Sequence, residues 1–106
     1  MTRQLLIGAF VLAGCVPANG RVDFTTLNPA PHPMAPRQPQ QVEVFENSPP
    51  ARAHVDVGSF QIAQWGGPKV DDFRVAAANR GCDGVVIYHH HDSDEGVCIV
   101  YTDSPP

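Results

Sequence analysis

Apolar and polar residues alternate over two short stretches, and each predicts a β-strand. In residues 42–46, Val42 and Val44 alternate with polar positions and are expected to face the core. In residues 54–63, apolar residues fall at 55 and 57 and then at 60 and 62, so the alternation slips at Gly58. A β-bulge or bend produces such a slip, and glycine tolerates it. We therefore expect two half-strands with a kink between them.

A helix is predicted after the second strand, ending near Arg80. Pro68 suits the first turn of a helix, where its missing amide costs nothing, and Gly81 suits the C-terminal end. Between them, Val70, Phe73 and Ala77 recur at helical spacing and form one apolar stripe. This stripe is expected to pack on the sheet.

Two apolar runs follow the helix. Residues 84–88 are continuously apolar apart from the first glycine, as in a central strand, and residues 97–101 form the second run. The polar segment between them indicates a hairpin centred near Ser93. That centre places Tyr88 opposite Cys98. Together these elements predict an α/β (α+β) domain over residues 41–103, a small and mostly antiparallel sheet of about four strands covered by one main helix.

The segment before the domain is rich in proline and lacks a sustained apolar pattern. Prolines occur at 17, 29, 31, 33, 36 and 39, and proline favours extended chain without amide donors. We expect residues 15–40 to be a disordered linker that acts as a semi-rigid spacer. Val22, Phe24 and Leu27 are exceptions, and they are either a short docking segment or incidental apolar residues.

The N-terminus has the pattern of a secretory signal. Arg3 is followed by an apolar run over residues 5–13, which is too short to span a bilayer. The run ends in Leu-Ala-Gly-Cys15 and resembles the lipobox of bacterial lipoproteins. That resemblance implies a signal peptide over residues 1–14 and a mature chain that begins at Cys15, with acyl chains such as palmitate on the cysteine. The alternative is a signal or N-terminal anchor that ends in a buried cysteine.

The net charge limits the classes of binding partner, and the other two cysteines raise the question of a disulfide. Removal of residues 1–14 changes the net charge from −4 to −5, which argues against binding to nucleic acid or acidic lipids. An oxidising compartment favours a disulfide between Cys82 and Cys98. The expected hairpin register, however, separates them by six residues, roughly 20 Å, against a limit near 7 Å between α-carbons. A disulfide and two buried thiols therefore both remain open.

One cluster has a metal-binding composition, residues 89–95 with the sequence HHHDSDE. In an extended chain His89 and His91 point to the same side, and Asp94 can add an oxygen ligand to a divalent metal. Imidazoles also titrate near pH 6.5, so the same loop is a candidate pH sensor. The third interpretation is a solvated hairpin loop with no cofactor.

Motifs for catalysis are missing from the sequence. It contains no Gly-x-Ser-x-Gly, no Cys-x-x-Cys and no phosphate-binding glycine loop, so we do not expect an enzyme. Trp65, next to two glycines, is expected either to cap the core or to anchor a partner.

Short motifs in residues 42–101 resemble a known family. They are Val-Glu-Val-Phe at 42–45, Pro-Pro at 49–50, Val-Gly at 57–58, the junction 76–87 and Val-Cys-Ile at 97–99. The segment is similar to small bacterial envelope lipoproteins related to the sensor lipoprotein of the Rcs envelope-stress phosphorelay, and to the YbjQ-like "heavy-metal-binding" superfamily. That resemblance implies a small sheet covered by one helix and tethered to the envelope. The Rcs sensor has four domain cysteines, whereas this chain keeps two.

These observations lead to one main hypothesis and two alternatives. We expect an outer-membrane lipoprotein, periplasm-facing or surface-exposed, whose domain is a binding or envelope-sensing module for another envelope protein. The outer membrane is favoured by Val16, since enterobacterial sorting signals place Asp after the acylated cysteine for retention elsewhere. The alternatives are a metal- or pH-responsive protein that uses the histidine loop, and a structural lipoprotein without a specific ligand.

Overall fold

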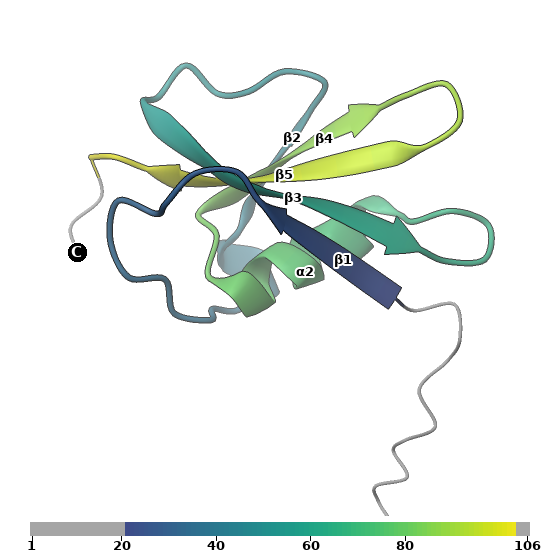
Figure 1. Ribbon diagram of the computed structural model, residues 1–106, viewed down its shortest axis with the longest axis horizontal. Helices are drawn as coiled ribbons and strands as arrows, with labels where there is room; N and C mark the ends of the chain where they lie inside the picture. Colours follow the sequence, from purple (N-terminus) through teal and green to yellow (C-terminus); the bar gives the residue numbers. More distant parts are fainter. Residues whose placement is uncertain (1–20, 104–106) are drawn as a thin grey trace, which may run out of the picture.

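Five strands form one mixed sheet in the order β1-β3-β5-β4-β2 (Figure 1), in a computed structural model that describes residues 21–103. Strand β2 runs parallel to β4, and all other neighbours are antiparallel. The predicted α+β class is confirmed. The described elements, in chain order, are β1 (Arg21–Thr26), the 3-10 turn η2 (Pro39–Gln41), β2 (Glu43–Glu46), β3 (His54–Ala63), α2 (Val70–Arg80), β4 (Gly84–His89) and β5 (Asp94–Tyr101).

Helix α2 covers one face of the sheet (Figure 1). The Asp72 carboxylate accepts a hydrogen bond from the Lys69 amide at 2.7 Å, which satisfies one free donor at the helix start. Gly81 ends the helix in the left-handed region with φ 83°. The predicted stripe is buried at Phe73 and Ala77, where it packs against core side chains of the sheet. On the opposite face, a second apolar cluster consists of Val86, Val97, Ile99 and Tyr101, with Phe45 and Tyr88 packed against it.

Strand β3 is kinked as predicted. Its register against β5 shifts between Asp56 and Gly58. The ring of Phe24 lies over Gly58, and a Cβ built there would approach its Cζ atom to 2.0 Å. Only glycine therefore allows β1 to pack so closely at this bend.

Residues 21–40 belong to the domain, so the prediction of a spacer over them and a domain boundary at 41 is wrong. Strand β1 pairs with β3 along its whole length, from Arg21 opposite Ala63 to Thr26 opposite Gly58. The rings of Phe24 and Phe60 are 4.9 Å apart, and the Arg80 guanidinium lies 3.8 Å above the Phe24 ring. Two alternating apolar residues are enough for an edge strand, because the neighbouring strand supplies the hydrogen bonds. The fifth strand, missing from the expected four, is β1.

The proline-rich stretch after β1 runs over the domain surface. Ala30 and Met34 pack against the core, and the Ala35 backbone lies against Gly81. The Arg37 amide donates to the Ala78 carbonyl at 2.9 Å, and its guanidinium is 3.2 Å from the Asp83 carboxylate. Proline removes donors but does not prevent an extended chain from covering apolar surface.

A disulfide joins Cys82 and Cys98 across the core, with 5.6 Å between the α-carbons. Both side chains are fully buried. The geometric argument against this bond was wrong, because Val85 and not Tyr88 pairs with Cys98. Cys82 also does not extend β4, since its amide donates to Ala77 at the helix end. Closing a loop of this length stabilises a fold by about 3 kcal/mol in the chain-entropy model.

The packing of Phe24 predicts how much β1 contributes to stability. Replacement of this half-buried ring in Phe24→Ala should lower the free energy of unfolding by about 2 kcal/mol, measured by urea denaturation. Leu27→Ala is the matched control, because Leu27 is half exposed, and it should change that free energy by no more than about 0.5 kcal/mol. If Phe24→Ala changed the free energy of unfolding as little as Leu27→Ala is expected to, residues 21–27 would not be part of the folded unit.

Candidate functional site

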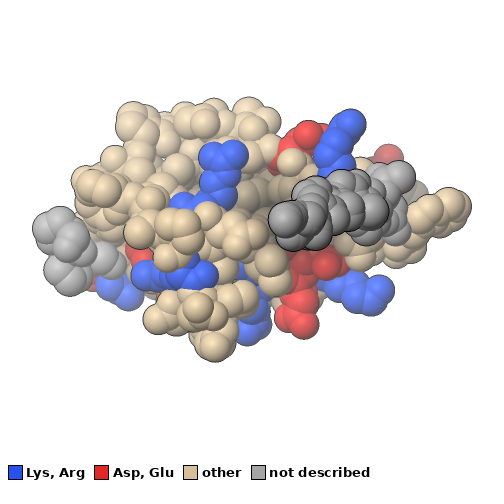
Figure 2. All heavy atoms as spheres, turned by 90° about the horizontal axis from the view of Figure 1, so that it is seen from below, with Lys and Arg blue, Asp and Glu red and all other residues tan. Residues whose placement is uncertain are grey.

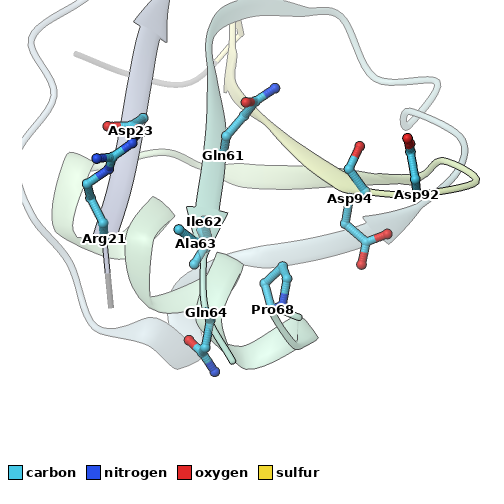
Figure 3. A pocket seen from close by; sticks show the side chains of 10 residues that line it. Arg21, Asp23, Gln61, Ile62, Ala63, Gln64, Pro68, Asp92 and Asp94 are labelled. Carbon is cyan, nitrogen blue, oxygen red and sulfur yellow. Dashed lines mark hydrogen bonds and ion pairs between the residues drawn. The ribbon is translucent and has the colours of Figure 1, made fainter. Parts of the chain in front are cut away.

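A cleft of about 370 Å³ opens where β1 begins and β3 ends (Figure 3). Figure 3 shows Arg21 and Asp23 on one side and Asp92 and Asp94 on the other. This volume lies within the range of small-molecule sites. The walls come from β1, the end of β3, the loop to α2 and the β4–β5 turn, and consist of Arg21, Asp23, Gln61, Ile62, Ala63, Gln64, Pro68, Asp92, Ser93 and Asp94.

The cleft is lined by polar groups of mainly acidic character. Asp23 lies directly opposite Gln61 in the β1–β3 register. The Arg21 guanidinium is 3.1 Å from the Asp23 carboxylate, and both are largely exposed, so this pair contributes little to stability. With three carboxylates and one guanidinium, the walls favour an amine or another hydrogen-bond donor.

His89, the last residue of β4, is bonded on both sides of its ring. Its Nε2 is 2.8 Å from Glu46 Oε1 on β2, and its Nδ1 is 3.1 Å from Asp94 Oδ1 on β5. Its backbone amide donates to the Asn47 side-chain oxygen at 3.1 Å. The histidine therefore connects three strands at the end of the sheet, and Asp94 belongs to this cluster as well as to the cleft.

The two carboxylates raise the pKa of His89 above its ordinary value of 6.5, through the hydrogen bond to Glu46 first and then the one to Asp94. Only the imidazolium can donate from both ring nitrogens. Because the folded-state pKa is raised, the stabilisation is fully present below pH 6.5 and is lost as the pH rises through the raised value.

The other two histidines of the loop have different surroundings. His90 Nε2 is 3.5 Å from Glu95 Oε1, and the other oxygen of Glu95 accepts the hydroxyl hydrogen of Ser59. Strand alternation places Glu95 on the face opposite Asp94. His91 is exposed at the turn. The side chains of this loop therefore do not gather at one place, since Asp94 and Glu95 lie on opposite faces of the sheet.

The predicted metal set, His89, His91 and Asp94, is only partly assembled. His89 and Asp94 meet, but Glu46 takes the place at the second ring nitrogen. Between residues 21 and 103, no group of three or more His, Cys, Asp or Glu side chains is arranged to hold a metal ion.

A second polar cluster lies at the opposite end of the sheet. The Tyr101 hydroxyl donates to Glu43, and the Arg52 guanidinium lies 3.8 Å above the Tyr101 ring. Burial and the Glu43 carboxylate raise the pKa of Tyr101 to about 12. Arg52 also pairs with Asp103 at 2.8 Å and thereby lowers the pKa of that carboxyl. These contacts hold the end of β5 against the loop before β3.

Sequence reasoning missed Glu46 and the β1 side of the cleft. Glu46 is 43 residues from His89, and only the parallel pairing of β2 with β4 brings the two together. Arg21 and Asp23 were assigned to the spacer. Their spacing of two residues, which places both side chains on one side of a strand, was the available signal.

Comparisons with protein-family models, curated proteins and solved structures return no match to this chain. No helix described in residues 21–103 is long and apolar enough to cross a membrane. Cys15 and the expected signal over residues 1–14 lie outside the described residues.

The contacts of His89 predict a titration that NMR can follow. We expect the pKa of His89 to lie above 6.5 and to fall in Glu46→Gln, because that variant removes the carboxylate whose hydrogen bond raises the pKa most. Glu95→Gln is the matched control, since Glu95 lies on the same hairpin but faces His90. A pKa at or below 6.5, or an equal fall in both variants, would contradict this electrostatic account.

Proposed function

We propose that this chain is a membrane-anchored bacterial lipoprotein whose α+β domain binds or senses another component of the cell envelope. The observation that carries this proposal is the distribution of the three cysteines. Cys82 and Cys98 form a buried disulfide, and disulfides persist mainly in exported proteins. Cys15 stands apart at the end of an apolar, signal-like run.

Acylation of Cys15 would supply the membrane anchor. Each buried methylene contributes about 0.8 kcal/mol, so two or three chains hold a protein firmly to a bilayer. The lipobox-like sequence and the resemblance to envelope lipoproteins support this step, and Val16 favours the outer membrane. The domain then acts in the envelope as a binding module.

The cleft at the start of β1 is the surface that best suits a partner. Its carboxylates at Asp23, Asp92 and Asp94 favour an amine or guanidinium group of an envelope component. Acidic and basic side chains are interspersed over the face shown in Figure 2, which supports local recognition over binding to a polyanion.

A second candidate function is pH sensing through His89, and one observation favours it. The Asp94 carboxylate lines the cleft and also binds the His89 ring. Deprotonation of His89 removes a positive charge next to the cleft wall, so an amine would bind more tightly as the pH rises. This change needs no rearrangement of the sheet.

Photo-crosslinking in the native bacterium tests the binding proposal. A photoreactive residue at Gln61, inside the cleft, should give a discrete crosslinked product in the membrane fraction. Cys15→Ser should move the protein out of that fraction and abolish the product, because the unacylated chain is no longer held at the membrane.

The matched control is the same photoreactive residue at Gln40, an exposed position at the opposite end of the sheet. It should not give the product obtained at Gln61. The cleft assignment fails if both positions give the same product, and the anchor assignment fails if Cys15→Ser stays in the membrane fraction.

A further inference from the structure

Trp65 is the most exposed large apolar side chain of the described residues, with 84% of its surface accessible. It is the only tryptophan of the chain. Gly66 and Gly67 follow it with φ of 77° and 82°, and the Gly67 amide donates to the Gln64 carbonyl at 2.9 Å. This turn projects the indole away from the core, so the expectation that Trp65 caps the core is wrong. Tryptophan is highly buried on average in folded proteins, so an indole this exposed is unusual.

The position of Trp65 relative to Cys15 is fixed by the β1–β3 pairing. Arg21 lies opposite Ala63, two residues before Trp65. From Cys15 the chain reaches Arg21 in six residues, which span at most about 20 Å. An anchor at Cys15 therefore keeps the Arg21 end of the sheet within about 20 Å of the bilayer, whereas the Leu27 end can lie about 20 Å farther away.

We infer that Trp65 inserts its indole into the headgroup layer of the bilayer that holds Cys15, an inference that rests on the acylation proposed above. Tryptophan is enriched at this layer because its ring is apolar and its N–H remains hydrogen-bonded. The layer is several ångströms deep, which matches the size of the ring.

The charged residues near Trp65 indicate whether an acidic or a neutral lipid surface suits this contact. Arg21 and Lys69 are exposed there, but so are Asp23, Asp71 and Asp92. Mixed charges give no net attraction to acidic lipids. The contact therefore depends on the apolar ring and on the tether, and it should form on a neutral, zwitterionic bilayer.

Intrinsic fluorescence tests the contact directly, because Trp65 is the only indole. The acylated protein is reconstituted in phosphatidylcholine vesicles, with or without lipids that carry a spin label at the headgroup. We expect the emission of Trp65 to shift to shorter wavelength on reconstitution. The labelled lipids should then quench most of it.

Trp65→Ala combined with Leu27→Trp is the matched control. Leu27 is 50% exposed and follows the far end of β1, about 20 Å from Arg21 at the rise of a strand. This relocated indole should keep the emission of a water-exposed ring and should not be quenched by the labelled lipids.

A separate sample distinguishes failure of this inference from failure of the proposed function. The chain from Cys15 onward contains every described residue, and Cys15 is its only cysteine outside the disulfide. A maleimide lipid therefore couples only at Cys15. If the protein from cells carries no acyl chain, the lipoprotein proposal fails. The protein coupled to the maleimide lipid then still tests whether an anchor at Cys15 brings Trp65 into the bilayer.

The outcomes are distinct. A shift and quenching in the anchored protein but not in the relocated-tryptophan variant support the contact. An unshifted, unquenched Trp65 in the coupled sample overturns it. A shift that appears without vesicles and grows with protein concentration also overturns it, because the indole would then contact a second copy of the chain.

Discussion

The pairing of β1 with β3 determines how the N-terminal segment joins this domain and where the cleft forms. Phe24 lies over Gly58 and against Phe60, and Arg80 covers the ring from the helix side. This contact brings the N-terminal segment into the sheet. It forms one wall of the cleft and fixes the place where the chain from Cys15 enters the fold. Without this contact, residues 21–40 would act as a long spacer, and the orientation of the domain relative to Cys15 would not be defined.

The disulfide is the second constraint, and it lies on the same helix-covered face of the sheet, because Cys98 pairs directly with Gly58. It links Cys82, two residues after the C-terminal end of α2, to Cys98 on β5. A domain of this size buries a modest fraction of its surface, so a covalent link inside the core contributes substantially to stability. Among the described residues, this bond is the observation on which the proposal of an exported protein rests.

Elements with a strong local pattern could be predicted from the sequence. The slip at Gly58, the stripe through Phe73 and the Gly81 helix end all appeared in the structure where the pattern placed them. Strand β1 could not be predicted, because it has only two apolar residues, Val22 and Phe24, and lies in a proline-rich part of the sequence. It is a strand because it pairs with β3. Glu46 was missed for a related reason, since parallel pairing joins residues far apart in sequence.

A small error in the predicted register of the β4–β5 hairpin changed the expected distance between Cys82 and Cys98. A centre misplaced by one or two residues increased the expected separation of Cys82 and Cys98 and argued against the disulfide, and the turn of the chain at Cys82 removes the rest of that separation. The histidine loop was affected in another way. Its three histidines have different surroundings, because His89 contacts Asp94, His90 contacts Glu95 and His91 is exposed at the turn. The predicted ligands His89, His91 and Asp94 are therefore only partly brought together.

The cleft, the histidine cluster and Trp65 all lie at one end of the sheet, close to the entry point of the chain. An anchor at Cys15 would therefore turn this end toward the membrane surface. A partner bound in the cleft would then be met close to that surface. If Cys15 is the anchor proposed above, its position would limit both the orientation of the domain and the partners that it can reach.

The most direct test is the intact mass of the protein purified from membranes, after unfolding and alkylation with and without prior reduction. The account predicts a chain that begins at Cys15 and carries acyl chains. It predicts no alkylation before reduction and alkylation of Cys82 and Cys98 after it. A chain with unmodified Cys15, or one whose Cys82 and Cys98 react without reduction, would contradict it.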